Sequence, residues 1–169
     1  MSSASDEDLY KLAARVGHAL LEQKRSLVTA ESCTGGWVAK AVTDIPGSSA
    51  WFRGGLVAYD NALKQGLLGV QVATLEVHGA VSDATVREMA MGALTALGGD
   101  LAVAVSGIAG PDGGQPGKPV GTVWFGWAWR HGQAIHHRTR LKIIEGDREQ
   151  IRRRSVQTAL SGLLEIESD

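Results

Sequence analysis

Ser32 and Cys33 are two potential nucleophiles that stand side by side in the sequence, between a strand pattern and a helix pattern. The β-branched run over 27–30 is typical of a strand, and the amphipathic spacing over 37–42 predicts a helix. A strand that turns into a helix through hydroxyl and glycine residues leaves free backbone N–H groups near the positive end of the helix dipole. The stretch Ala30–Gly36 therefore predicts a pocket that binds an anion or stabilises a developing oxyanion.

A serine nucleophile needs a base, and lysine and histidine are the candidate types here. Lys64 lies one turn into a helix that is predicted to begin after Tyr59-Asp60-Asn61. The pKa of a free lysine is about 10.4 and that of a useful base about 7–8, so burial or a helix N-terminus would have to destabilise the ammonium by about 4 kcal/mol. His78 and His131 are alternatives by type, at the ends of predicted segments.

Simpler interpretations of these residues remain open from the sequence. Ser32 and Thr34 are of types that commonly cap helices, and Cys33 could pack as a small buried hydrophobe. Lys64 could be a solvated surface lysine, and Tyr59 could donate a hydrogen bond or only pack.

A glycine- and proline-rich loop over 106–119 is the second candidate for a binding feature. It follows the apolar run over 101–105, which is typical of an interior strand, and open α/β sheets bind ligands at the carboxyl ends of their strands. Its glycines would let the backbone approach a substrate closely. Arg148, in the first turn of the last predicted helix, could pair with a phosphate. A surface loop and a solvated arginine are the alternatives.

Common motifs of nucleotide and hydrolase chemistry are absent. Gly117-Lys118 looks like the end of a phosphate-binding P-loop, but Asp112 stands where glycine is required and Pro119 replaces Ser or Thr. No G-x-G-x-x-G follows a strand, and Ser32 lacks the flanking glycines of G-x-S-x-G. The five histidines form no metal-binding pattern, so we do not expect a metal site.

Length, charge and cysteine content favour a single compact domain over 1–169 in the reducing cytoplasm. The net charge of −1 predicts no bulk attraction to nucleic acid or to an anionic membrane. Arg152-Arg153-Arg154 is the one local basic run, and its place inside a helix pattern favours a solvated face. The sequence shows neither a signal-peptide pattern nor an apolar run of membrane-spanning length.

Helix and strand patterns alternate early in the sequence, and a hairpin pattern comes late, which predicts an α/β fold with three layers, α/β/α, around a mixed, mostly parallel sheet. Helices are predicted after the capping residues Ser5, Ser82 and Asp147. Further helices are predicted over 37–42, 61–68 and 73–78, and strands over 26–30, 56–59, 101–105, 121–129 and 134–141.

Several motifs, in order over nearly the whole sequence, closely resemble the CinA C-terminal domain family, whose stand-alone PncC-type members are nicotinamide mononucleotide deamidases. The family's fold is an α/β/α sandwich, in agreement with the pattern above. The motifs are Ala30-Glu31-Ser32-Cys33-Thr34-Gly35-Gly36, Gly47-Ser48-Ser49, Tyr59-Asp60-Asn61-Ala62-Leu63-Lys64, Gly79-Ala80-Val81-Ser82, Ser106-Gly107-Ile108-Ala109-Gly110-Pro111, Lys118-Pro119-Val120-Gly121-Thr122-Val123 and Gly146-Asp147-Arg148.

The resemblance implies hydrolysis of nicotinamide mononucleotide to nicotinate mononucleotide and ammonia, in pyridine nucleotide salvage, without a metal or cofactor. It implies that Ser32 is the nucleophile, that Lys64 is its base and that Tyr59 supports the proton transfers. Backbone N–H groups over 32–34 would hold the oxyanion, and Arg148 would bind the phosphate. The other residues expected to contact the substrate are Glu31, Cys33, Thr34, Gly35, Asn61, Ser106 and Gly107. A homo-oligomer is also implied, with a dimer favoured.

The sequence leaves two rival functions open. A non-catalytic nucleotide-binding or regulatory module would use the same pocket and release no product. A thiol amidase would use Cys33 in place of Ser32. Release of ammonia from nicotinamide mononucleotide separates the hydrolases from the binding module, and the activity of a Cys33→Ala variant decides the thiol alternative.

Overall fold

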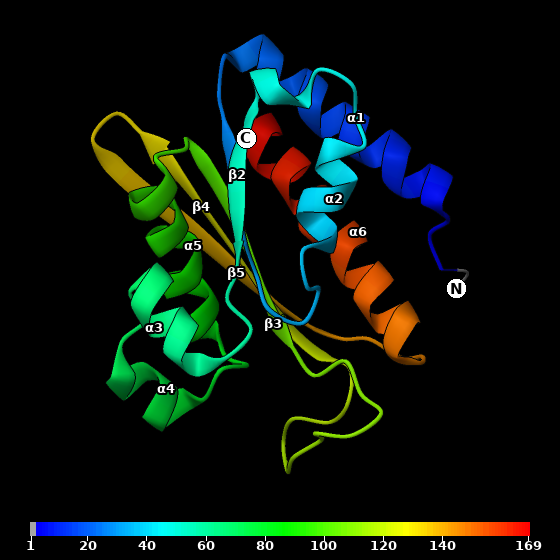
Figure 1. The fold of residues 1–169 in the computed structure, drawn as a ribbon, viewed down its shortest axis with the longest axis vertical. Coiled ribbons are helices and arrows are strands. Elements are labelled where there is room, and N and C mark those ends of the chain that lie inside the picture. Colours follow the sequence, from blue (N-terminus) through cyan, green and yellow to red (C-terminus); the bar gives the residue numbers. More distant parts are fainter. Residues whose placement is uncertain (1–2) are drawn as a thin grey trace.

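A computed structural model describes residues 3–169, which form a five-stranded sheet with helices on both faces (Figure 1). The strands are β1 (Leu27–Glu31), β2 (Phe52–Val57), β3 (Leu101–Gly107), β4 (Thr122–His131) and β5 (Ala134–Ile143). The helices are α1 (Asp6–Gln23), α2 (Trp37–Thr43), α3 (Asn61–Leu68), α4 (Val72–His78), α5 (Asp83–Leu97) and α6 (Arg148–Ser168), with a short 3-10 turn, η1 (Ser48–Ala50).

The sheet is mixed, in the order β2-β1-β3-β4-β5. β1 lies between β2 and β3 and is parallel to both, whereas β4 is antiparallel to β3 and to β5. Only β4 therefore runs against the common strand direction. This arrangement confirms the predicted α/β class with a mixed, mostly parallel sheet.

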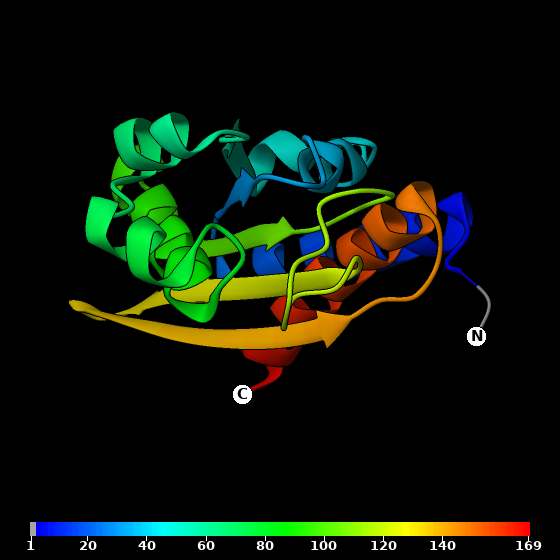
Figure 2. The same ribbon diagram turned by 90° about the horizontal axis from the view of Figure 1, so that it is seen from below.

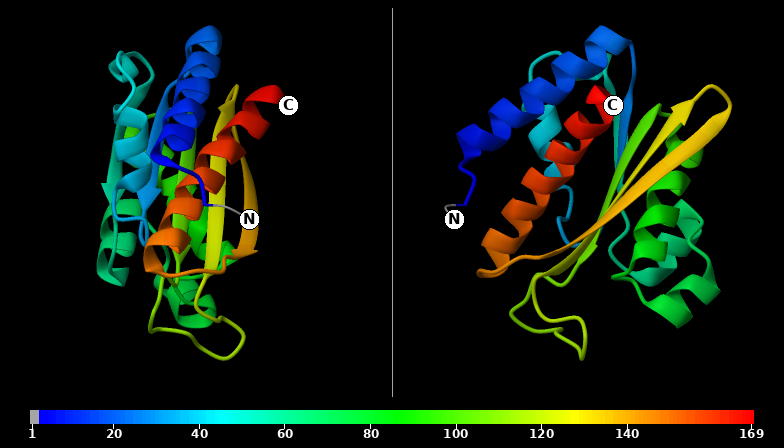
Figure 3. Two further views of the ribbon diagram at one scale, coloured as in Figure 1. Left: turned by 90° about the vertical axis from the view of Figure 1, so that its right-hand side faces the viewer. Right: turned by 180° about the vertical axis from the view of Figure 1, so that it is seen from behind.

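Two helical layers cover the sheet (Figures 1 and 2). α1, α2 and α6 lie on one face, and α3, α4 and α5 lie on the other, as the views from the side and from behind also show (Figure 3). β3 is apolar on both faces because Leu101, Val103 and Val105 belong to one core cluster and Ala102 and Ala104 to the other. The continuous apolar run in the sequence is thus an interior strand, as predicted.

α6 approaches the sheet closely because Gly162 has no side chain. A Cβ at this position would overlap the Trp127 indole of β4, which is buried beneath the helix. The indole Nε1 donates a hydrogen bond to the Ala159 carbonyl of α6 at 3.1 Å. This contact sets the height of α6 over the sheet, and α6 carries Arg148 and Arg152.

Local sequence signals predicted the helix starts well. The Ser5, Ser82 and Asp147 side chains each accept a hydrogen bond from a backbone N–H group three residues later, which confirms the three predicted caps. The strand predicted over 56–59 is wrong in its bounds, because β2 begins at Phe52 and ends at Val57. Its glycine-containing first half is held by parallel pairing with β1, a tertiary contact that local pattern does not reveal.

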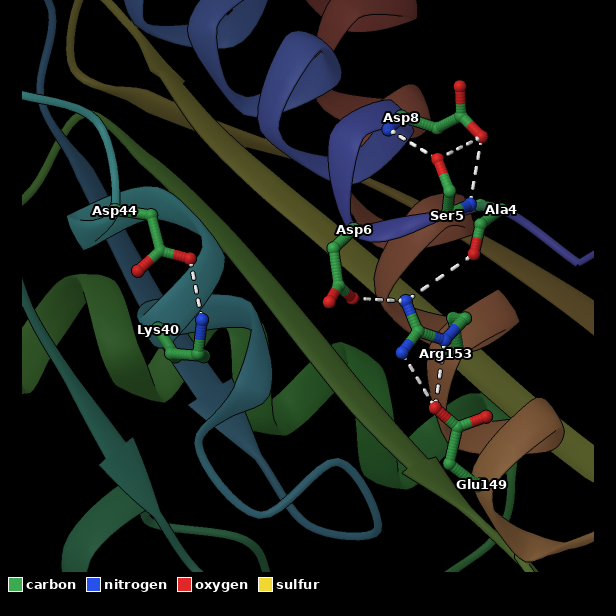
Figure 4. A network of polar contacts seen from close by, with 8 residues as sticks. All are labelled: Ala4, Ser5, Asp6, Asp8, Lys40, Asp44, Glu149 and Arg153. Atoms are coloured by element: carbon green, nitrogen blue, oxygen red, sulfur yellow. Dashed lines mark hydrogen bonds and ion pairs between the residues drawn. The ribbon is translucent and has the colours of Figure 1, made fainter.

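The basic run in α6 is not the solvated face that was predicted. Arg153 is half-buried and forms ion pairs with Asp6 at 2.6 Å and with Glu149 at 2.7 Å (Figure 4). It also donates to the Ala4 carbonyl, so it fastens the start of α1 to α6. Within residues 3–169, no helix is both long and apolar enough to cross a membrane.

Candidate active site

The carboxyl ends of β1, β2 and β3 meet at one edge of the sheet, at the lower end in Figure 1. Ser32 directly follows β1, and its N–H group donates to the Val105 carbonyl of β3 at 2.9 Å. The Ala58 N–H group, just after β2, donates to the Glu31 carbonyl of β1 at 2.9 Å. The parallel pairing thus continues one residue past β1 and fixes the backbone of the candidate nucleophile.

Lys64 belongs to α3, the helix that follows β2, and its side chain extends to Ser32. The Lys64 Nζ atom lies 3.1 Å from the Ser32 Oγ atom and donates to the Tyr59 carbonyl at 3.0 Å. Asp60 caps α3 by accepting from the Leu63 N–H group at 2.8 Å, which fixes where this helix begins. Lys64 is 1% exposed and Ser32 is 8% exposed, so the contact is shielded from bulk water.

Burial lowers the pKa of the Lys64 ammonium, against the opposing influence of Asp60 and of Cys33. No carboxylate pairs with this ammonium among residues 3–169; its two partners are a hydroxyl and a carbonyl oxygen. The neutral amine, which a general base requires, is therefore favoured relative to a lysine in water.

The pKa of the Cys33 thiol is shifted away from its reactive form, in contrast to that of Lys64. Burial, and then the Glu31 carboxylate, raise the pKa of Cys33 to about 12. The thiolate is the nucleophilic form of cysteine, so a thiol held protonated at neutral pH is a poor nucleophile. This observation weighs against the thiol amidase alternative and favours Cys33 as a buried packing residue.

The buried carboxylate of Glu31 forms hydrogen bonds with the turn that follows β1 and with the start of α2. The carboxylate accepts from the Thr34 hydroxyl at 2.6 Å and from the N–H groups of Val38 and Ala39 at 2.8 and 3.1 Å. The expectation of free N–H groups at the start of α2 is therefore wrong for Val38 and Ala39, because Glu31 already occupies that helix end. The N–H group of Thr34 has no acceptor within the part of the chain that the structure describes.

Arg152 of α6 holds the same turn from outside, and sequence reasoning missed it. Its Nε and Nη2 atoms donate to the carbonyls of Cys33 and Thr34, each at 3.1 Å. Its guanidinium lies over the Trp37 ring, 5.5 Å from the ring centre. The one available signal was its spacing of four residues from Arg148, which places both arginines on one helix face.

Tyr59 and Arg148 lie together at this edge, but the Tyr59 hydroxyl is directed away from the lysine. Tyr59 is 57% exposed, and its hydroxyl accepts from Arg148 at 3.2 Å. Arg148 also donates to the Gly110 carbonyl at 2.6 Å and so links the loop after β2 to the loop after β3. The part of Tyr59 that contacts Lys64 is its backbone carbonyl.

The remaining predicted substrate contacts differ in their surroundings. Ser106 is buried, and its hydroxyl donates to the Ala80 carbonyl at 2.8 Å. Gly107 lies within β3, where a Cβ would come 2.7 Å from a Val123 methyl group, so close strand packing requires glycine there. Asn61 and Gly35 are exposed to solvent.

The alternative bases lie elsewhere. His78 ends α4 and His131 ends β4; both are exposed, and neither contacts Ser32 in the described structure. No group of three or more His, Cys, Asp or Glu side chains among residues 3–169 is placed to hold a metal ion. The pair that lies at this edge is the buried Ser32 hydroxyl beside the buried Lys64 amine.

The family profile of the CinA C-terminal domain matches residues 9–166. The chain belongs to this family. Among curated relatives, the Escherichia coli K12 nicotinamide-nucleotide amidohydrolase PncC is 52% identical over 159 residues, 94% of each chain. A protein of the same name from Pseudomonas putida is 50% identical over 155 residues, 92% of this chain and 94% of its own.

Solved structures of the CinA superfamily share the fold. A Klebsiella pneumoniae CinA superfamily protein superposes with a TM-score of 0.89 at 41% identity, covering 95% of this chain and 98% of its own. Membership in the CinA family and this structural likeness confirm the resemblance that the seven sequence motifs indicated.

Proposed function

We propose that this protein is a nicotinamide-nucleotide amidohydrolase that converts nicotinamide mononucleotide to nicotinate mononucleotide and ammonia. The observation that carries the chemistry is the buried contact of 3.1 Å between Ser32 Oγ and Lys64 Nζ. The substrate class is supported by relatives of 52% and 50% identity that bear this name. We further propose a role in pyridine nucleotide salvage in the cytoplasm, within one domain spanning 1–169 that assembles as a homo-oligomer.

The first half-reaction forms an acyl-enzyme. Neutral Lys64 takes the proton of Ser32 while the Oγ atom attacks the carboxamide carbon, and negative charge develops on the carbonyl oxygen. The N–H group of Thr34, which has no acceptor among residues 3–169, is the candidate donor to that oxygen. The Lys64 ammonium then delivers its proton to the departing nitrogen, the C–N bond breaks, and ammonia leaves.

The second half-reaction regenerates the enzyme. Lys64, neutral again, takes a proton from water as the water oxygen attacks the acyl carbon. Collapse of the second tetrahedral intermediate breaks the bond to Ser32, which recovers its proton from Lys64. The Tyr59 carbonyl accepts a hydrogen bond from the lysine throughout, and this contact keeps the Nζ atom in place.

The nucleotide would be bound by groups around this pair. Arg148 is the proposed phosphate ligand, since its present partners are the neutral Gly110 carbonyl and the Tyr59 hydroxyl. Cys33, Thr34, Gly35, Asn61 and Gly107 are proposed to line the substrate site. For Glu31 and Ser106 we propose an indirect contribution, because their polar atoms are already bonded to Thr34 and Ala80.

The decisive experiment is to add nicotinamide mononucleotide to the pure protein and measure both ammonia and nicotinate mononucleotide. We expect equal amounts of the two products, and a loss of about 10³-fold or more in kcat for Ser32→Ala. Binding of the nucleotide without any product would support the regulatory-module alternative instead. Full activity of Ser32→Ala would contradict the serine mechanism, and full activity of Cys33→Ala would exclude the thiol amidase.

A further inference from the structure

Arg152 bonds two consecutive carbonyls of the turn that carries Ser32. Its Nε and Nη2 atoms donate to Cys33 and Thr34 at 3.1 Å each, from a helix that lies 119 residues further along the chain. A planar guanidinium that donates two hydrogen bonds fixes both the distance and the orientation of its acceptors. The backbone of the turn is thus held from outside by one side chain.

Peptide geometry carries this constraint to the opposite side of the turn. Among the described residues, only the Gly110–Pro111 bond is cis, so the peptide units after Cys33 and Thr34 are trans. In a planar trans unit the C=O and N–H groups point in opposite directions. When Arg152 binds the carbonyls of Cys33 and Thr34, the N–H groups of Thr34 and Gly35 must point away from it.

The N–H groups of Gly35 and Thr34 differ in their hydrogen bonding. That of Gly35 donates to the Ser32 carbonyl at 2.9 Å and closes the turn. That of Thr34 belongs to a residue that is 0% exposed, and no acceptor for it lies among residues 3–169. Buried backbone donors without a partner are rare, and such a donor beside a candidate nucleophile suits an oxygen of a bound reactant.

The positive charge of Arg152 lies beside the turn and is not neutralised by a carboxylate within residues 3–169. It forms no ion pair with a carboxylate in the described part of the chain, and its partners are two carbonyls and the Trp37 ring. Its effect is felt at Cys33, where it opposes the burial that raises the pKa of the thiol. A positive charge behind the Cys33–Thr34 peptide polarises that unit, which makes its N–H group a stronger donor.

We propose that Arg152 is a positioning residue of the hydrolase, which orients and polarises the Cys33–Thr34 peptide unit so that the Thr34 N–H group stabilises the oxyanion. The inference rests on the proposed function for its substrate, but it requires only that Ser32 forms a tetrahedral adduct. Arg152 itself does not contact the reacting atoms.

The test compares Arg152→Ala and Arg152→Lys with the matched control Arg153→Ala. Arg153 lies over the same Trp37 ring at 5.0 Å, but it bonds Asp6 and Glu149 and not the turn (Figure 4). With nicotinamide mononucleotide as substrate, we expect kcat of Arg152→Ala to fall by about 10–10²-fold with KM changed less than about threefold, because an oxyanion contact acts in the transition state. Millimolar guanidinium should restore part of the lost rate, and Arg153→Ala should keep kcat within about twofold.

A second measurement does not depend on the substrate. Diisopropyl fluorophosphate should form a bond between its phosphorus and Ser32 Oγ as the P–F bond breaks, with fluoride leaving and the serine proton passing to Lys64. The phosphoryl oxygen then takes the place of the oxyanion, so labelling of Arg152→Ala, followed by intact mass, should slow by a factor similar to that in kcat. Arg152→Lys should fall between the wild type and Arg152→Ala, because an ammonium cannot hold both carbonyls in one plane.

The outcomes separate the two proposals. Ammonia release by the wild type together with unchanged kcat and labelling in Arg152→Ala would overturn the role of Arg152 and leave the hydrolase intact. Labelling of the wild type without ammonia release would overturn the substrate, and the labelling rates of the variants would then decide the role of Arg152. If the wild type neither hydrolysed the nucleotide nor reacted at Ser32, both proposals would fall.

Discussion

At the scale of single residues, the site depends on where one amine is buried. Lys64 is enclosed beside Ser32 and has no carboxylate partner among residues 3–169, so burial lowers its pKa. A lysine exposed to water would be protonated at neutral pH and could not accept the serine proton. The environment of Lys64, more than its identity, therefore makes it a candidate base.

Lys64→Arg should abolish turnover, because a guanidinium does not lose its proton in the accessible pH range. In the wild type, kcat/KM should rise with pH as Lys64 deprotonates, with a midpoint below the value of 10.5 for an unperturbed lysine. The measurement is a pH–rate profile for ammonia release. A midpoint at or above 10.5 would contradict the assignment of Lys64 as the base.

The same amine should make stability depend on pH. Because the pKa of Lys64 is lower in the folded state, the unfolded state binds more protons between the two pKa values, and the free energy of unfolding should rise with pH up to about 10.5. Below the folded-state pKa this contribution should be constant and destabilising. Urea unfolding of the wild type and of Lys64→Met at several pH values tests this, since the variant should lack that part of the rise.

At the scale of elements, the short helix α2 begins against a buried carboxylate. Glu31 receives one hydroxyl and two backbone N–H groups, and so joins the end of β1 to the first turn of α2. The start of this helix depends on a side chain from the preceding strand, since Gly36 at the capping position has none to offer. Glu31 thus gives the turn around Ser32 its inner support, as Arg152 gives it the outer one.

Glu31→Gln should lower the free energy of unfolding by about 1–3 kcal/mol, because the amide keeps one acceptor oxygen and brings an NH2 group against backbone donors. Denaturant unfolding measures this loss. Asp44→Asn is the matched control, since Asp44 is exposed and, among residues 3–169, its carboxylate forms an ion pair only with Lys40. We expect the control to change stability by less than about 1 kcal/mol, and an equal effect of the two substitutions would contradict the buried role of Glu31.

At the scale of the whole molecule, the site is assembled from segments that the two helical layers bring to one sheet edge (Figure 2). Ser32 lies on the chain after β1, Lys64 comes from the layer of α3, and Arg148 and Arg152 come from the opposite layer. The close packing of Gly162 on Trp127 sets the position of α6, and through it the position of both arginines.

Gly162→Ala should destabilise the protein by about 1–3 kcal/mol, because its methyl group would overlap the Trp127 indole and push α6 from the sheet. It should also reduce kcat, since Arg152 would no longer reach the turn. Gly66→Ala is the matched control, because among residues 3–169 no atom outside its chain neighbours and the nearby backbone of α3 lies within 4 Å of a Cβ at that position. Thermal unfolding should show a lower Tm for the first variant and an equal or higher one for the second.

Much of this architecture was readable in the sequence where the cause is local. The caps at Ser5, Ser82 and Asp147 involve backbone groups three residues away, and the apolar run of β3 reflects burial on both faces. The candidate nucleophile was suggested by a strand that turns into a helix. The choice of Lys64 over His78 or His131 came from the family resemblance, because the residues alone left all three open.

Tertiary contacts decided the pKa shifts at the site and the role of Arg152, because a side chain's environment depends on residues that are distant in sequence. Burial lowered the pKa of Lys64 and raised that of Cys33, and no pattern around either residue encodes its neighbours. Arg152 was mistaken for a solvated residue because its acceptors lie 119 and 118 residues away. Local periodicity sets which face of a helix is apolar, but only the packing of α6 on the sheet decides which arginine on that helix meets the turn.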